Sequence, residues 1–149
     1  MQRRSGRRRR AARNWGSFPT TADVGIWARA REPAQLYARL GTALSALTVD
    51  LRGVRPAAER RLSAEGVDPS SLLVAYLGEL LLLEQEEGFL VRSVAVELRG
   101  RPPTSLTARA RGEPYDPARH RRRKEVKAVT LHRLLLDFAA GRGRVIVDI

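Results

Sequence analysis

Residues 89–110 read FLVRSVAVELRGRPPTSLTARA, and this segment determines the class of fold more than any other. Apolar and polar side chains alternate along Phe89–Arg99 and again after Thr104, which is the period of a strand with one buried face. Between the two runs, Gly100-Arg101-Pro102-Pro103 turns the chain. Strands joined by so short a turn pair antiparallel. The alternating apolar residues are Leu90, Val94, Val96 and Leu98, followed by Leu106, Ala108 and Ala110.

Similar patterns extend from this hairpin toward both ends of the chain. We expect further strands at residues 23–31, 59–64, 126–138 and 144–149. The second of these holds few apolar residues, so we expect it to be short or to lie at a sheet edge. Two helices separate the early strands. The order strand, helix, strand, helix and then four strands predicts an α+β fold, a single domain in which a largely antiparallel sheet has two helices packed on one face.

Each expected helix begins with its own signal. Glu32-Pro33 and Asp68-Pro69 place a proline in the first turn, where its missing N–H is harmless, and Asp68 is a favoured N-cap. The helix at residues 70–88, SSLLVAYLGELLLLEQEEG, is apolar nearly all round, which predicts burial on most sides or one side offered to a partner. The earlier helix has one inward face, formed by Leu36, Leu40, Leu44 and Leu47.

The positive charge is unevenly distributed along the 149 residues, which carry a net charge of +12. Residues 1–17 hold seven arginines and no acid, so we expect a disordered arginine-rich tail, followed by one domain at residues 18–149. A solvated arginine surface and a nucleic-acid footprint both explain the basic runs, because arginine is abundant throughout this chain. The candidates for RNA contact lie in a second basic run and are Arg119, Arg121, Arg122 and Arg123.

The sequence predicts a cytoplasmic protein without a membrane segment. No apolar stretch follows the first arginines before Phe18-Pro19, as a secretory signal would require. The longest nearly continuous apolar run, residues 72–83, contains Glu79 and is shorter than the roughly 20 residues that span a bilayer. The chain also contains no cysteine, which excludes a disulfide scaffold.

The residue types exclude most catalytic chemistry. Without cysteine there is no thiol nucleophile and no Cys-ligated metal, and His120 and His132 are too few for a multi-histidine centre. Motifs for serine hydrolases, zinc proteases, phosphate loops and dinucleotide binding are absent. We therefore expect no enzymatic activity from this chain, and we expect any ligand chemistry to depend on carboxylates, lysines and the backbone.

Two aspartates stand at the ends of expected strands. Asp23 opens the first strand, and Asp148 closes the last one, a single residue before the terminal carboxylate of Ile149. If these strands are antiparallel neighbours, the three carboxylates converge at one end of the sheet. Such a group attracts a hard cation such as calcium or magnesium. Aspartates at strand ends also commonly face water, so the residues alone leave both interpretations open.

Three further polar residues interrupt the apolar patterns. Lys127 lies within an expected strand, where its stem can cover apolar surface while its ammonium group meets water. His132 fits a partly buried, hydrogen-bonded histidine, and Glu113 fits the cap of a turn. Taken alone, these residues do not indicate a function.

In combination, these segments resemble the archease family. The resemblance extends from Phe18 to Ile149, in the family's order, and four motifs carry it. They are Thr21–Ile26, similar to the amino-terminal motif H-T-A-D-I-G; Leu72–Leu81, similar to a leucine-rich helix; Gly112-Glu113, His120 and Val126–His132, similar to the block G-E…H…V-K-A-V-T-Y-H; and Val145–Ile149, similar to an ending in D-I.

The resemblance implies a small α+β protein of the strand-helix-strand-strand type that activates an RtcB-type RNA ligase in tRNA splicing. Such an activator promotes guanylylation and repeated turnover of the ligase, which uses GTP and manganese, and it catalyses no reaction itself. The resemblance also implies a divalent cation, calcium with magnesium or manganese as alternatives, held by Asp23, Asp148 and Ile149. Lys127 falls on a lysine regarded as functional, and we expect Glu113 and His132 to face the partner.

Two residues depart from the family pattern, and one other class of function stays open. Thr20 stands where relatives usually have histidine, and Leu131 replaces the usual tyrosine. The alternative function is an RNA-binding accessory, or a chaperone-like modulator of a tRNA-modifying methyltransferase, with the arginines as the binding surface.

Overall fold

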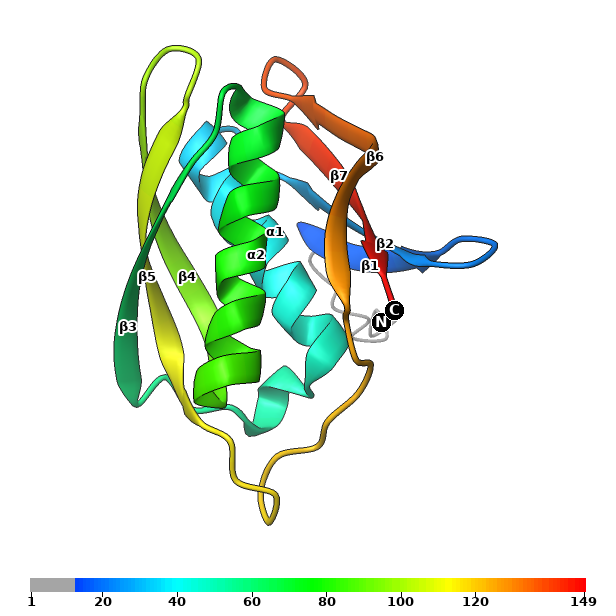
Figure 1. Cartoon of the computed structure of the whole chain (residues 1–149), viewed down its shortest axis with the longest axis vertical. Coiled ribbons are helices and arrows are strands. Elements are labelled where there is room, and N and C mark those ends of the chain that lie inside the picture. The colour runs from blue at the N-terminus through cyan, green and yellow to red at the C-terminus, as the bar shows by residue number, and fades with distance from the viewer. Residues whose placement is uncertain (1–12) are drawn as a thin grey trace, which may run out of the picture.

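The structure is a computed structural model that describes residues 13–149, so residues 1–12 of the expected tail lie outside the described residues. Within this range the elements follow one another in the order β1, β2, α1, η1, β3, α2, β4, β5, β6 and β7 (Figure 1). Every element predicted from the sequence is present, and the chain adds the strand β1 and the short 3-10 turn η1, Leu51–Gly53.

The strands form two separate sheets, and all their pairings are antiparallel. The four-stranded sheet has the order β1-β2-β7-β6, and the three-stranded sheet has the order β3-β5-β4. The weak strand β3 lies at an edge, as its few apolar residues predicted. The bounds are β1 Trp15–Pro19, β2 Val24–Arg29, β3 Ala58–Glu65, β4 Phe89–Arg99, β5 Ser105–Pro114, β6 Ala128–Asp137 and β7 Arg142–Asp148.

Both helices lie between the two sheets (Figure 1). Helix α1, Pro33–Thr48, packs on β4, β2 and β1, whereas α2, Pro69–Glu87, packs on β6 and β3. The α+β class and the antiparallel pairing are therefore confirmed. The strands, however, are divided between two sheets, where the sequence predicted one sheet with helices on one face. The apolar circumference of α2 explains the difference, because one sheet covers only one side of such a helix.

Local signals set the helix ends. The Asp68 side chain accepts a hydrogen bond from the Ser71 N–H at 2.7 Å, which satisfies one free amide at the start of α2. Gly88 ends this helix with φ of 63°, a left-handed conformation that glycine adopts without a steric penalty. Glu79, on the exposed side of α2, faces solvent. No helix among residues 13–149 is long and apolar enough to cross a membrane.

The ordered structure begins earlier than the sequence predicted. Residues 15–17 were expected in the disordered tail, yet they form the first part of β1, which pairs with β2. Close packing explains this pairing. A side chain on Gly25 would place its Cβ 2.0 Å from the Phe18 ring, so only glycine lets β1 lie this tightly on β2. Whether residues 15–17 form a strand depends on this pairing with β2. No local sequence pattern predicts such a pairing for a short run next to seven arginines.

The core between the sheets contains two tyrosines that differ in their hydrogen bonding. The Tyr37 hydroxyl donates to the Pro69 carbonyl oxygen at 2.6 Å. The Tyr76 hydroxyl is fully buried and has no hydrogen-bond partner among the described residues. Burial raises the pKa of both phenols well above the usual range, so both stay protonated. Tyr76 therefore retains a buried donor without an acceptor, which costs stability.

Replacing Tyr76 with phenylalanine is expected to stabilise the fold. The Y76F variant keeps the ring and removes the unsatisfied hydroxyl, so the free energy of unfolding rises by about 1 kcal/mol. Urea denaturation followed by circular dichroism measures this change. Y37F is the matched control. Its free energy of unfolding is expected to fall by a similar amount, because the Tyr37 hydroxyl forms a hydrogen bond that this substitution removes. A Y76F protein less stable than the parent would contradict the prediction.

Candidate functional site

The candidate site lies at one end of the four-stranded sheet. β2 and β7 are antiparallel neighbours, with Val24 opposite Val147. Asp23 immediately precedes Val24 and Asp148 immediately follows Val147, so the register places the two aspartates beside each other. The C-terminus lies at this end of the sheet as well (Figure 1). The strand pairing on which the convergence of carboxylates depends is thus confirmed.

The two aspartates point away from the core. Val24 and Val147 are buried, and successive side chains of a strand face opposite sides, so their aspartate neighbours lie on the outer face. Asp23 is half-buried and Asp148 is exposed. Neither carboxylate forms an ion pair with another of residues 13–149. Both are therefore available to bind a cation.

The donor set fits a hard divalent cation. Among the described residues, no three side chains of His, Cys, Asp or Glu form a metal-binding group. The two aspartates alone therefore do not complete such a group, and the third expected ligand, the carboxylate of Ile149, directly follows Asp148. Carboxylate oxygens without nitrogen or sulfur ligands are the donors that calcium and magnesium prefer. By its chemistry, this set suits those ions rather than zinc or copper.

The backbone joins Lys127 and Thr20 to the two aspartates. The Lys127 N–H donates to the Asp148 carbonyl oxygen at 2.7 Å, which fixes the start of β6 beside the end of β7. The Thr20 hydroxyl accepts from the Asp23 N–H at 3.0 Å, and the Thr20 N–H donates to the Asp23 carbonyl at the same distance. Thr20 thus closes the turn before β2, a structural role that needs no histidine at this position.

A basic hollow of about 660 Å³ adjoins this end of the sheet. Its cationic lining comprises Arg122, Arg123, Lys124 and Lys127, and Glu84 of α2 is one of its acids. Burial raises the pKa of the Glu84 carboxyl, an effect opposed by the Thr48 side chain and by Arg122 at 3.5 Å. The excess of cationic groups makes this hollow attractive to an anion such as a phosphate.

Glu113 is buried within the fold, which disfavours the partner-facing position that we expected. It lies at the end of β5, in the other sheet, and its side chain is only 8% exposed. Its carboxylate accepts hydrogen bonds from the Arg55 N–H at 2.7 Å, from Arg119 and from His120 at 3.0 Å. We call Arg55, Glu113, Asp116, Arg119 and His120 the Glu113 cluster. This cluster fastens the loop after β5 to the segment after α1.

Hydrogen bonding fixes the orientation of His120 in this cluster. Nδ1 accepts from the Asp116 N–H at 2.8 Å, so Nε2 carries the hydrogen that is donated to Glu113. Hydrogen bonds from Arg119, the Arg55 N–H and His120 lower the pKa of Glu113 to about 2. The carboxylate is therefore ionised over the whole physiological range, and it acts as a fixed anchor.

Part of the second basic run is held within the fold. Arg119 pairs with Glu113 while its side chain stays 35% exposed, so its possible contact with RNA stays a prediction. The Arg123 and Lys124 N–H groups donate to the carbonyls of Thr48 and Leu47, the last turn of α1. The Arg122 guanidinium lies 4.1 Å from the centre of the Tyr115 ring. Arg121, Arg122 and Arg123 remain exposed, so their contact with RNA stays a prediction.

His132 is exposed rather than partly buried. It lies where the pairing of β6 with β7 is interrupted between Thr130 and Leu135, and the next residue, Arg133, has φ of 57°. Leu131 is 55% exposed. The irregularity lies farther along β6 than Ala128, which is opposite Asp148, so His132 is not part of the group at the sheet end. Its expected role at a partner surface stays a prediction.

Two residues that shape these sites could not be predicted from the sequence. Arg55 contributes its main-chain N–H to Glu113, and a backbone donor leaves no trace in the residue type. Glu84 lies in an acidic stretch of α2 that looks like an ordinary solvated helix end. Only the packing of residues 121–127 over that helix end shows that Glu84 lines a hollow. A contact between segments so far apart in the chain cannot be recognised from a local sequence pattern.

Comparison with known proteins agrees with the motifs. The sequence model of the archease protein family matches residues 15–149, beginning at the first residue of β1. A protein archease of Methanopyrus kandleri is 36% identical over 138 residues, covering 91% of this chain and 99% of the relative. One of Methanothermobacter thermautotrophicus is 33% identical over 135 residues, with 89% and 96% covered.

A solved structure extends this similarity to the fold. The solution structure of Methanobacterium thermoautotrophicum protein 1598 aligns with a TM-score of 0.73 and 30% sequence identity. The alignment covers 91% of this chain and 99% of that structure. Two sheets enclosing two helices are therefore shared along nearly the whole length.

Proposed function

This chain belongs to the archease family, and on that premise we propose that it is a non-catalytic activator of an RtcB-type RNA ligase in tRNA splicing or RNA repair. It promotes formation of the ligase's covalent guanylate and allows repeated turnover. The proposal rests on one observation above all. The register of β2 and β7 gathers Asp23, Asp148 and the chain terminus at one exposed sheet end, on the positions that the family resemblance assigns to a cation.

A divalent cation at this end would be held by Asp23, Asp148 and the terminal carboxylate of Ile149. Calcium suits an oxygen-only set best, with magnesium or manganese as alternatives. When bound, the ion supplies positive charge that neutralises phosphate oxygens. The chain itself contributes the anionic ligands and their placement, since the pairing of Lys127 with Asp148 holds the last strand in register.

The basic hollow supports the same function. Lys127 lines it together with Arg122 and Lys124, so positive charge adjoins the acidic sheet end. A nucleotide-binding partner presents phosphate groups, and these interact favourably with both a bound cation and exposed ammonium or guanidinium groups. The residues expected to contact the ligase are therefore those at the sheet end and in the hollow, and not the buried Glu113.

A ligase assay tests this function directly. An RtcB-type ligase is incubated with labelled GTP and manganese, with and without an equal amount of this chain, and the covalent guanylate is followed over time. The chain is expected to accelerate guanylate formation and to raise the number of RNA joints made per ligase. Co-purification of the two proteins provides a second measurement. Equal rates with and without the chain would refute the proposal.

A further inference from the structure

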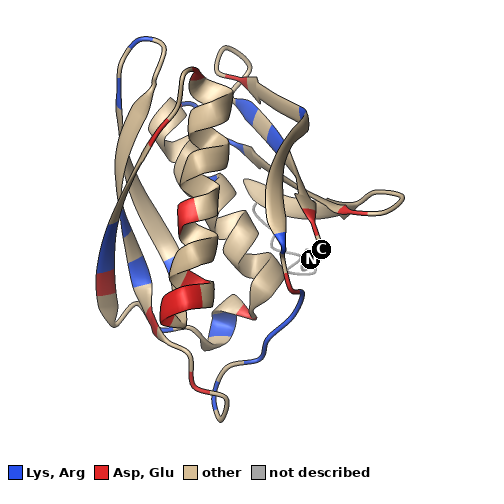
Figure 2. Ribbon diagram, in the orientation of Figure 1, with Lys and Arg blue, Asp and Glu red and all other residues tan. Residues whose placement is uncertain are grey.

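The outer face of the three-stranded sheet, opposite the helices, carries charged and small residues. Residue pairing places Arg61 of β3 opposite Arg109 of β5, and Arg109 opposite Ala95 of β4. Arg61 and Arg109 are exposed, whereas Ala108 and Ala110, the neighbours of Arg109 on β5, are buried toward the helices. Two positions along β5, Arg111 lies on the same outer side, opposite the exposed Glu59 of β3. Figure 2 shows blue segments on β3 and β5 in this region, and a red segment beside the blue one on β3.

These three arginines are not used by the fold. None of their guanidinium groups forms a hydrogen bond or ion pair with another of residues 13–149, in contrast to Arg52 and Arg119. Like charges directly opposite each other on a sheet destabilise the pairing. Arg61 and Arg109 therefore oppose stability where they stand, and an anion between them would remove that repulsion.

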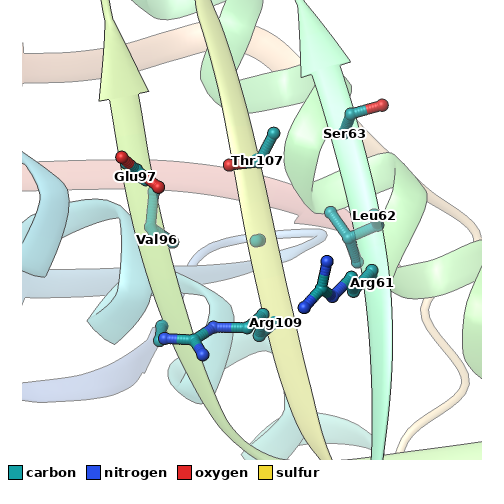
Figure 3. Close-up of a pocket in the computed structure, with 9 residues that line it drawn as sticks. Arg61, Leu62, Ser63, Val96, Glu97, Thr107 and Arg109 are labelled. Atoms are coloured by element: carbon teal, nitrogen blue, oxygen red, sulfur yellow. The ribbon is translucent and has the colours of Figure 1, made fainter.

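The sheet face is hollowed beside the arginines. A shallow depression of about 770 Å³ is lined by Arg61, Ser63, Ala95, Thr107 and Arg109. In Figure 3 the guanidinium groups of Arg61 and Arg109 extend over the lower part of the depression, and Glu97 lies toward its upper part. The small side chains of Ser63 and Ala95 leave the space open. Anion binding is thus confined to the arginine half, because Glu97 repels anions at the other end.

We propose that Arg61, Arg109 and Arg111 form a binding surface for the phosphodiester backbone of an RNA strand. Arg109 and Arg111 are separated by about 7 Å along β5, so they can bind successive phosphates of an extended strand. Guanidinium groups bind phosphate oxygens in pairs. The outward positions of β3, β4 and β5 hold no aromatic residue, so bases are not stacked and binding is independent of sequence.

Three arginines spread along the sheet face, with Glu59 beside Arg111 at one end and Glu97 at the other, favour an extended polyanion over a single phosphorylated side chain. A phosphopeptide presents one dianionic group, which two arginines satisfy, and it is usually held in a closed pocket with additional apolar contacts. The depression is broad and shallow, and Arg111 lies outside its lining, two residues beyond Arg109 on β5. The inference does not depend on activation of a ligase. The three arginines lie in the three-stranded sheet, whereas Asp23 and Asp148 lie at the end of the four-stranded sheet.

Binding of a short, fluorescently labelled oligouridylate to the full chain tests the proposal. The double variant R61Q/R109Q is compared with R31Q/R101Q, which removes the same charge at two exposed arginines outside this surface. The two double variants have the same net charge and both keep the arginines at residues 3–13. Any RNA binding by those arginines is therefore equal in the two variants. At low salt we expect about tenfold weaker binding for the first variant, and a slope against log salt reduced by about 1.4, the value for two lost phosphate contacts. The second variant should stay within about twofold of the parent.

Further measurements separate this surface from the proposed ligase site and from misfolding. E97Q is expected to strengthen RNA binding, because it removes the carboxylate from the depression. D148A should bind RNA like the parent while losing ligase stimulation. Melting temperatures at or above that of the parent are expected for R61Q/R109Q, since the facing charges are gone. Equal losses in both double variants, or a loss only with a phosphopeptide probe, would overturn the proposal.

Discussion

Replacement of Asp148 with alanine is expected to abolish stimulation of ligase guanylylation while leaving the fold intact. Asp148 contributes one of the two adjacent side-chain carboxylates at the sheet end, and its side chain is exposed. The bond from the Lys127 N–H to the Asp148 carbonyl uses only the backbone, so D148A keeps it. A surface substitution of this kind shifts the melting temperature by no more than about 2 °C.

Two further variants separate charge from shape in this experiment. D148N keeps the size of the side chain and removes its charge, so it should lose nearly all stimulation as well. E86Q removes an exposed charge from α2, away from the sheet end, and should stimulate like the parent. The rate of guanylate formation is measured at several concentrations of each variant, which distinguishes weaker binding to the ligase from a lower maximal effect.

Calcium titration of the isolated chain gives a measurement that needs no ligase. The parent should bind one ion, and D23N and D148N should each weaken binding by at least about tenfold, because either substitution removes one of few charged ligands. Full stimulation by D148A together with unchanged calcium binding would eliminate the carboxylate mechanism. The chain would still belong to the family, but binding of a cation by these carboxylates would not explain its function.

The sequence was most informative about single elements and their ends. Alternation along residues 89–110 predicted β4, the turn and β5, and Asp68-Pro69 predicted the start of α2, because each signal is local. The division into two sheets was not predictable in this way. It depends on how the apolar circumference of α2 is shared between β6 and β3, and strand periodicity is identical in either arrangement.

The same distinction applies to the candidate site. From the residues alone, the meeting of Asp23 and Asp148 depended on whether their strands were antiparallel neighbours, and the register of β2 and β7 meets this condition. Glu113 was assigned to the partner surface because it shares a motif with Lys127, and a shared motif does not distinguish a residue that binds a partner from one that holds the fold. A side chain on Gly112 would come within 1.7 Å of the Leu90 carbonyl oxygen. The Gly112-Glu113 motif is thus explained by packing and anchoring alone.

Replacement of Glu113 with glutamine is expected to lower the melting temperature by several degrees at neutral pH. The change leaves the Arg119 guanidinium without its buried carboxylate and weakens the bonds from the Arg55 N–H and from His120. The loop of residues 115–124, which also caps the end of α1, should then exchange its amide hydrogens faster. Differential scanning fluorimetry and hydrogen exchange measure the two effects, with E86Q as the matched control.

The pH dependence of the melting temperature tests the role of Glu113 more specifically. The pKa of Glu113 is lowered from about 4.5 to about 2 in the folded chain, so the unfolded chain binds a proton first as the pH falls. The stabilisation is therefore complete above about pH 4.5 and is lost as the pH approaches 2. The gap in melting temperature between the parent and E113Q should be constant near neutral pH and shrink across this window. If E113Q instead abolished ligase stimulation at an unchanged melting temperature and loop exchange, Glu113 would act on the partner after all. The anchoring role would then be wrong, because an anchor cannot be removed without loosening the segments that it joins.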